Sequence, residues 1–441
     1  MTLLDVSVTN VALPSIARAT AATSAELQWV VSGYTLAFGL VPVLAGRLGD
    51  DHGRRLMFQV GVGSFAATSL LAGVAPTAAV LIGARVLQGL AGGLINPQVS
   101  GLVQQLFRSH ERGRAFGVLG TTVGVGTALG PIVGGALISL GGPHLGWRLV
   151  FFVNIPVGVA VISLARRLLP ADRRQGRHRL DIAGAALLGA ATLCVLLAAV
   201  QYESARDLRL MLLVLPAIAL LVGFFRRERR LTVAERDPLV DLRLFRAPSY
   251  TAGVVFALAY FPAMAGLPLV LSIYYQDGLG YTALQSGLGV TAYALGSAIG
   301  APLAGRVVTR VGRPLLLIGL AGFAVGSIAL AVLAGHGALV LSPALFVMGA
   351  GSGAIITPNQ ALTLMRVDPV AGSTAGGVLQ TAQRIGLAVG QAVIGATFFT
   401  AVGAGHYPHA LRLGVVAALI FLVLAAAVGV ADMVGKQREP V

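Results

Sequence analysis

Long runs of uncharged, mostly apolar residues follow one another along the whole chain, separated by short segments that carry the charges. A membrane-spanning helix needs about 20 such residues. The pattern therefore predicts an all-α, multi-pass membrane protein. Dividing the runs at charges and at Gly/Pro breaks gives fourteen candidate spans, near residues 1–17, 27–48, 56–74, 77–104, 114–140, 149–169, 181–201, 208–225, 249–275, 283–304, 314–334, 338–365, 370–400 and 411–431.

Composition excludes several classes of function. Only 11% of the 441 residues are charged, against about 25% in average soluble chains, so a soluble enzyme is excluded. Cys194 is the single cysteine, and the seven histidines fall in loops or at span edges, which argues against a metal site or a disulfide framework. Lys436 is the only lysine, so the Gly-Lys-Ser/Thr loop that binds ATP phosphates is missing. We expect no cofactor.

The formal net charge of +15 is distributed unevenly. If the loops alternate sides and residues 46–55 are cytoplasmic, most of the 32 Lys and Arg residues lie on the cytoplasmic side. This bias predicts a cytoplasmic (inner) membrane protein with both termini cytoplasmic. The basic runs 173–179 and 226–230 flank spans, so we expect them to contact anionic lipid rather than nucleic acid.

The two halves of the chain repeat each other. Gly46 and Gly53 of the first half match Gly305 and Gly312 of the second at a constant offset. Two similar six-helix units are typical of carriers that rock one half against the other, although coincidence in a Gly-rich chain is an alternative. The pattern predicts bundles at residues 1–169 and 249–441, joined by a two-helix insertion and connectors at 170–248.

Asp5 is the only acidic residue deep inside an apolar segment. An ionisable group in hydrocarbon costs roughly 2.5–3.5 kcal/mol on insertion scales, so such a group usually marks a pathway or a proton relay. Arg85, near the start of the fourth span, is the candidate partner because a guanidinium stays charged. The alternatives are a helix-end Asp5 and an Arg85 whose head group reaches the membrane surface.

The segment from Gly46 to Arg55 is expected to be a tight turn between two spans. Gly46 and Gly53 allow close backbone approach, while Asp50, Arg54 and Arg55 can form a charge cluster that holds the cytoplasmic face together. Gly-x-x-x-Asp-x-x-Gly-Arg-Arg between apolar helices resembles the signature loop of the major facilitator superfamily. The resemblance implies two six-helix bundles related by the repeat.

The fifth span carries glycines at close spacing, which favour helix contact, and a Gly-Pro pair that would act as a hinge. The pattern resembles the motif that marks the antiporters of this superfamily, with simple helix packing as the alternative. Its residues are Gly126, Gly130, Pro131, Gly134 and Gly135.

Residues 4–14, 147–158, 238–245 and 376–386 are similar to segments of the fourteen-helix drug:proton antiporters, in the same order along the chain. Two departures stand out. Asp51 occupies a position that is usually basic in that family, so the charge cluster is expected to pair differently. The family's first helix also extends about ten residues before its aspartate. In the chain as written, Asp5 would lie near the cytoplasmic edge instead of mid-helix, so we expect the start at Met1 to be internal or truncated.

The resemblance implies proton-coupled export of small amphipathic drugs, antibiotics or secondary metabolites by a protein that works as a monomer. An exporter of a single endogenous metabolite or lipid is the alternative with the same fold. An intramembrane enzyme is disfavoured because no His, Cys or paired carboxylates converge within the spans, and a sensor because no soluble output domain is visible. Candidate residues of a substrate cavity are Asn10, Tyr34, Gln88, Asn96, Asn154, Tyr260, Gln380 and Arg384.

The shortage of acidic residues in the spans also bears on cargo. Doubly charged cations should be poor substrates. Monocations, neutral compounds or acids attracted by Arg85 and Arg384 fit better.

Overall fold

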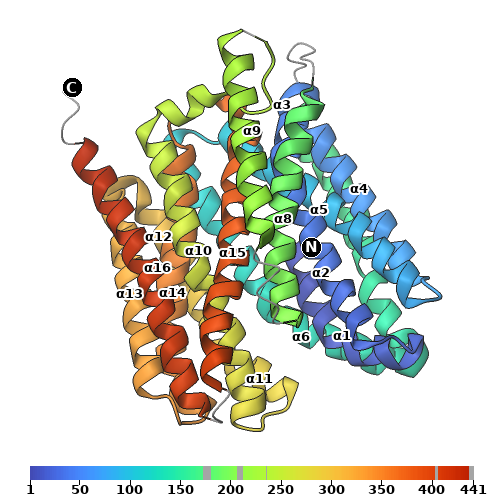
Figure 1. Cartoon of the computed structure of the whole chain (residues 1–441). Helices are drawn as coiled ribbons and strands as arrows, with labels where there is room; N and C mark the ends of the chain where they lie inside the picture. Colours follow the sequence, from blue (N-terminus) through green and yellow to red (C-terminus); the bar gives the residue numbers. More distant parts are fainter. Residues whose placement is uncertain (172–179, 206–211, 235, 403–405, 437–441) are drawn as a thin grey trace.

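A computed structural model describes the chain except for residues 172–179, 206–211, 235, 403–405 and 437–441. The regular elements of this described part are helices, and most of them run side by side along one direction (Figure 1). The all-α fold predicted from the sequence is therefore confirmed. The basic run 173–179 lies outside the described residues.

The first half of the chain folds into helices that pack mainly on one another, with α5 against α2 and α4, and α6 against α1. A bend of 48° separates α2 from α3. These helices are α1 (Thr2–Thr20), α2 (Ser24–Leu40), α3 (Pro42–His52), α4 (Arg54–Gly73), α5 (Ala78–Leu106), α6 (Ser109–Phe152) and α7 (Asn154–Leu168).

The second half repeats this arrangement, with α14 packed on α12 and α13, and α10 on α15 and α16. Its elements are α10 (Pro248–Ile273), η3 (Tyr274–Gly278), α11 (Ala283–Gly289), α12 (Thr291–Val311), α13 (Pro314–Val332), α14 (Ala338–Leu364), η4 (Pro369–Ala371), α15 (Gly372–Val402) and α16 (Tyr407–Lys436). The halves meet where α6 packs on α12 and where α3 and α5 pack on α15.

Between the halves in sequence lie α8 (Ile182–Ala205), α9 (Val214–Val233) and the short η2 (Leu242–Arg246). Helix α8 packs on α9 and also contacts both α2 and α15. This pair of helices therefore stands beside the junction of the two halves (Figure 1).

Each of the fourteen predicted spans overlaps a helix of the structure. Within the described residues, nine helices are long and apolar enough to cross a membrane, or ten if the bent pair α2–α3 forms one span. Helix α1, the first part of α6, α8 and α9 do not reach this criterion over the residues that are described.

The internal repeat is visible in backbone geometry. Gly53 ends α3 with a φ of 109°, and Gly312 ends α12 with a φ of 69°. Positive φ values are accessible to glycine at little cost and are strained for other residues. The two glycines that align in the sequence therefore both end a helix with a positive φ.

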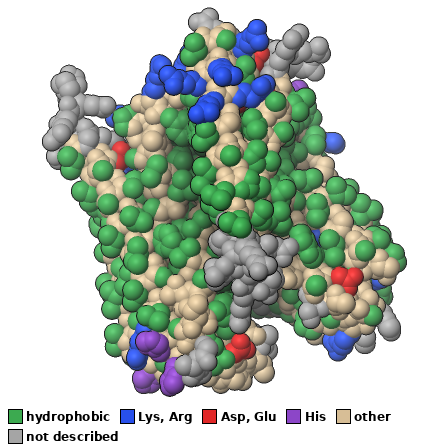
Figure 2. Space-filling model, in the orientation of Figure 1, with side chains coloured by type: hydrophobic (Ala, Val, Ile, Leu, Met, Phe, Trp, Pro, Cys, Tyr) green, Lys and Arg blue, Asp and Glu red, His purple; other side chains and the backbone are tan. Residues whose placement is uncertain are grey.

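Charge and hydrophobicity are segregated on the surface. Figure 2 shows hydrophobic side chains over the middle of the molecule and Lys and Arg gathered at one end, where α3 and α9 reach the surface. We call this the basic end. The opposite end, on the face shown, carries most of the visible histidines.

Candidate functional site

Asp5 lies on α1 inside the first bundle, with none of its surface exposed. The Nη1 atom of Arg85 lies 2.5 Å from its Oδ2 atom. The Oδ1 atom accepts hydrogen bonds from Nδ2 of Asn154 at 2.7 Å and from Nε2 of Gln88 at 3.0 Å. Helices α1, α5 and α7 thus meet at one carboxylate, and the partner predicted for Asp5 is present.

The guanidinium of Arg85 is held from several sides and is 1% exposed. Its Nε atom donates to the carbonyl of Val30 at 3.1 Å, and its Nη1 atom also donates to Oε1 of Gln88 at 2.6 Å. The ring of Tyr34 lies 4.2 Å from the guanidinium carbon. A buried ion pair is tolerated when such hydrogen bonds satisfy its remaining polar atoms. The cluster is therefore electrically neutral and well bonded.

The position of Asp5 corrects one expectation. In the chain as written we expected Asp5 near the cytoplasmic edge, whereas the amino terminus lies at mid-height of the bundle (Figure 1). Asp5 is placed within the bundle because Arg85, which it contacts, sits two turns inside α5.

Asp50, at the basic end, joins the two halves of the chain. Its Oδ2 atom accepts hydrogen bonds from the backbone N–H and the hydroxyl of Thr374, both at 2.8 Å, and its Oδ1 atom accepts from the N–H of Ser373 at 3.1 Å. These N–H groups belong to the first turn of α15, where a carboxylate is favoured by the helix dipole. We call the contacts of Asp50 and Arg54 with residues 369–374 the latch.

Arg54 forms the second part of the latch. Its Nη2 atom donates to Asp50 at 2.7 Å and to the carbonyls of Pro369 and Val370, the latter at 3.2 Å. Its Nη1 atom donates to the carbonyl of Gly101 on α5 at 2.7 Å. One guanidinium therefore ties α3, α5 and the segment before α15 together.

The rest of the signature segment is more helical than expected. Gly46 and Asp50 belong to α3, and the sharp turn is confined to Gly53. A Cβ atom on Gly46 would collide with the backbone carbonyl of Ser373, so glycine is required for the approach of α3 to α15. Arg55 bonds instead to the carbonyl of Arg166 at 2.8 Å.

The departure at Asp51 also has a structural counterpart. Its Oδ2 atom lies 3.2 Å from Nε of Arg47 on the same helix. The acidic residue is thus paired within α3, while Asp50 is engaged across the interface.

The glycines of the antiporter-like motif on α6 fall into two groups, which differ in whether another helix packs against them. A Cβ atom on Gly130 would overlap Ser7, and one on Gly134 would come within 3.0 Å of Val8, so these two glycines admit α1. A Cβ atom on Gly126 or Gly135 would meet no described atom within 4 Å. The side chain of Pro131 lies outside the described residues.

No backbone break marks the Gly130–Pro131 pair, where we expected a hinge. The non-helical residue inside α6 is Gly142, with a φ of 66°.

A cavity of about 210 Å³ lies between the halves, beside the Asp5 cluster. Tyr34 and Phe38 of α2 face Arg384 and Gln391 of α15 across it, and Leu196 of α8 forms part of its wall. Tyr34 connects the cavity to Arg85, because its ring covers that guanidinium. Two of the candidate cavity residues, Tyr34 and Arg384, therefore line this space.

The other candidates lie elsewhere. Gln88 and Asn154 belong to the Asp5 cluster. Gln380 lies near Ser100, with 3.5 Å between Nε2 and Oγ, in the closed contact between α5 and α15. Tyr260 is fully buried among aromatic rings of the second bundle and donates to Ser352. Asn10 is on an exposed face of α1, and Asn96 is partly buried on α5.

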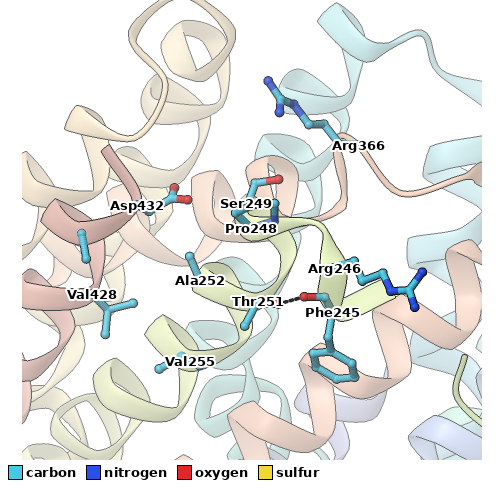
Figure 3. Close-up of a pocket in the computed structure, with 11 residues that line it drawn as sticks. Phe245, Arg246, Pro248, Ser249, Thr251, Ala252, Val255, Arg366, Val428 and Asp432 are labelled. Atoms are coloured by element: carbon cyan, nitrogen blue, oxygen red, sulfur yellow. Dashed lines mark hydrogen bonds between the residues drawn. The ribbon is translucent and has the colours of Figure 1, made fainter. Parts of the chain in front are cut away.

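A larger pocket, of about 460 Å³, opens near the basic end between α10, α16 and η2 (Figure 3). Ala252, Val255 and Val428 form an apolar wall, and the hydroxyl of Thr251 donates to the carbonyl of Phe245 at 2.7 Å. Asp432 borders it and pairs with Arg313 at 2.5 Å.

Several of these contacts were missed by sequence reasoning. The first turn of α15, which receives Asp50, lies more than 300 residues away and carries no motif of its own. Asp432 lies one residue beyond the predicted span 411–431, so the sequence did not single it out. The repeat held a signal for its partner, because Arg313 follows Gly312 as Arg54 follows Gly53.

Comparison with known proteins agrees with this geometry. The family model described as "Major Facilitator Superfamily" matches residues 1–289 and 252–439. The chain is 38% identical over 410 residues to a probable actinorhodin transporter of Streptomyces coelicolor, covering 91% of this chain and 71% of that protein.

It is also 35% identical over 317 residues to the tetracenomycin C resistance and export protein of Streptomyces glaucescens, covering 71% of this chain but only 57% of the relative. The proton:xylose symporter XylE has the same fold, with a TM-score of 0.68 and 16% sequence identity. The match covers 96% of this chain and 92% of XylE. The chain is a transporter, not an enzyme, and belongs to the major facilitator superfamily.

Proposed function

We propose that this protein exports small amphipathic molecules, such as drugs, antibiotics or secondary metabolites, across the cytoplasmic membrane in exchange for protons. One observation carries the proposal: Asp5, a fully buried carboxylate paired with Arg85, lies beside a cavity between two halves that are latched at one end. The relatives named for actinorhodin transport and tetracenomycin C export support the class of cargo.

The basic end is the cytoplasmic end in this proposal, following the positive-inside rule. The latch closes that end, so the conformation described here is one in which the cavity is shut off from the cytoplasm. Opening the latch and separating α3 and α5 from α15 would give the inward-facing state. Residues 1–169 and 249–441 then move as two units within one monomer, with the insertion at their border.

Proton binding acts on the bonds of Asp5. The carboxylate accepts hydrogen bonds from three side chains, one at Oδ2 and two at Oδ1. These donors use three of the roughly four lone-pair sites of the carboxylate, and a proton on the remaining site of Oδ2 removes the negative charge. The charge-assisted attraction that holds Arg85 to Asp5 is then lost. Since the contacts join α1 to α5 and α7, and Arg85 also contacts Tyr34 at the cavity, the loss is transmitted to the cargo site.

The proton gradient supplies enough energy for efflux. One proton that moves down 100 mV releases about 2.3 kcal/mol, and one pH unit adds about 1.4 kcal/mol. Together they support an accumulation ratio of several hundred, on the order of 10²–10³.

Proteoliposomes with an imposed pH gradient test the proposal. A panel of neutral and singly charged dyes is offered, and dye movement and proton counterflow are recorded together. We expect export that collapses with an uncoupler and with Asp5→Asn but persists in Asp277→Asn, an exposed aspartate at the other end. Export in Asp5→Asn that still follows the pH gradient would refute the role of Asp5.

A further inference from the structure

Arg384 is a positive charge placed inside the cavity between the halves. It lies on α15 and faces Tyr34 and Phe38 of α2. Its guanidinium carbon is 4.2 Å from the centre of the Phe38 ring. The side chain is only partly exposed, so it is reached from the cavity rather than from bulk solvent.

The described residues provide no carboxylate for this guanidinium. The guanidinium lies over the face of Phe38, a cation–π interaction. Asp5, the nearby carboxylate of the first bundle, is engaged by Arg85, Gln88 and Asn154. Among the described residues that line the cavity, Arg384 is the one with a charged side chain.

A cation that is largely withdrawn from water and has no anion beside it is costly, and an aromatic face offsets only part of that cost. A guanidinium also presents planar, paired donors that match a carboxylate or sulfonate. An anionic ligand would therefore balance the charge of Arg384 and accept hydrogen bonds from its guanidinium.

We infer that the central cavity binds organic anions, with Arg384 as the residue that recognises the acidic group. The rings of Tyr34 and Phe38 make an aromatic or amphipathic acid the fitting class of ligand, and Leu387 and Ala388 add apolar lining. A volume of about 210 Å³ suits a ring system carrying one acidic group. The inference deepens the proposed function, on which it rests for the direction of transport.

Binding of three matched probes tests the inference on the purified full chain. The probes are 2-naphthoate, its neutral amide 2-naphthamide, and the cation 2-naphthylmethylammonium. We expect 2-naphthoate to bind at least about tenfold tighter than the amide, as a charge-assisted hydrogen bond provides. Equal or weaker binding of 2-naphthoate, including no binding at all, would overturn the inference.

Variants identify the residue responsible. Arg384→Gln should abolish the preference for 2-naphthoate, Arg384→Lys should retain part of it, and Arg412→Gln, an exposed arginine at the opposite end, should behave as the wild type. Retained binding of the amide shows that Arg384→Gln is folded. If Arg384→Gln still prefers 2-naphthoate over the amide, Arg384 does not recognise the acidic group.

The two proposals fail separately. If cations bind best while gradient-driven export persists, the anion inference fails and proton-coupled export stands. If Arg384-dependent binding of 2-naphthoate is found but no cargo moves against a gradient, the binding inference stands and the proposed function fails.

Discussion

Arg54 and Arg313 occupy equivalent positions in the two halves, each directly after the glycine that ends a helix, but they bind different partners. Arg54 pairs with Asp50 and reaches across the interface to the carbonyls before α15. Arg313 pairs with Asp432 of α16 and donates to the carbonyl of Ser249, both within its own half. The repeat thus uses one arginine for the latch and the other for the internal packing of a bundle.

Removing Asp432 should lower stability while leaving the conformational equilibrium unchanged. Arg313 and Asp432 are 5% and 8% exposed, and loss of one partner from a buried pair costs about 3–5 kcal/mol. We expect a clearly lower melting temperature for Asp432→Ala in detergent. Asp50→Asn should shift the inward/outward equilibrium and lower the melting temperature less, because opening the latch exposes Arg54 to water. A shifted equilibrium in Asp432→Ala with an unchanged equilibrium in Asp50→Asn would contradict the different roles given to Arg313 and Arg54.

Gly46→Ala should prevent closure of the latch. The added methyl group would collide with the backbone carbonyl of Ser373, which cannot rotate away. Overpacking of this kind costs about 1–3 kcal/mol, enough to move the population by roughly tenfold or more. Spin labels at His52 and Val370, both exposed, should report a larger separation.

Gly83→Ala is the matched control, because a Cβ atom there meets no described atom within 4 Å. Identical label distances in Gly46→Ala and Gly83→Ala would show that the latch closes without the close packing of α3 on α15 at Gly46.

Asp5 and Arg85 should behave as a coupled pair. Asp5→Asn or Arg85→Gln alone leaves a buried charge or its hydrogen bonds uncompensated, at a cost of about 3–5 kcal/mol, whereas the double variant restores neutrality. We expect the double variant to melt closer to the wild type than either single one, without proton-coupled export. Additive losses in a double-mutant cycle would exclude the coupling.

The sequence was sufficient for the fold and for the central pair. Runs of apolar residues located the helices, the Gly53/Gly312 repeat located equivalent turns, and burial cost singled out Asp5 with Arg85 as partner. These inferences depend on local composition, or on ionisable residues whose placement in an apolar segment costs free energy. Contacts such as Asp50 with Thr374 depend on how two halves dock, which no local pattern encodes. Tyr260 was a cavity candidate, but its hydroxyl donates to Ser352 within the second bundle, a tertiary contact that local sequence does not encode either.

Docking of the connector onto the insertion should depend on pH through Glu228. Its side chain lies beyond the predicted span 208–225 and accepts a hydrogen bond from the N–H of Val240 at 2.9 Å. Burial raises the pKa of Glu228 to about 7. Between its ordinary pKa near 4.5 and about 7, the undocked state ionises first, so docking weakens as pH rises through that window.

Hydrogen exchange of residues 236–247 measured from pH 5 to pH 8, corrected for intrinsic rates, checks this expectation. Protection should fall with rising pH in the wild type and stay nearly constant in Glu228→Gln, which keeps a neutral side chain of the same size. Protection that rises with pH in the wild type would contradict the expectation that docking weakens as the pH rises.

Transport of an anion in exchange for a proton should be strongly electrogenic. An outward anion and an inward proton each move one charge in the direction favoured by an inside-negative potential, so the potential contributes about 4.6 kcal/mol per 100 mV, twice the value for neutral cargo. Direct charge competition cannot couple the two, because a proton on Asp5 makes the surroundings of Arg384 more positive. Asp5→Asn should accordingly bind 2-naphthoate at least as tightly as the wild type while losing proton-driven export.

Potassium diffusion potentials set by valinomycin in proteoliposomes give the measurement. At fixed pH gradient, a change of about 59 mV alters a one-charge equilibrium tenfold, so the steady-state ratio of 2-naphthoate should change about a hundredfold and that of 2-naphthamide about tenfold. A 2-naphthoate ratio that ignores the potential would mean that the net charge moved is zero. Such a result would be incompatible with a proton on Asp5 and an anion on Arg384 crossing the membrane in opposite directions.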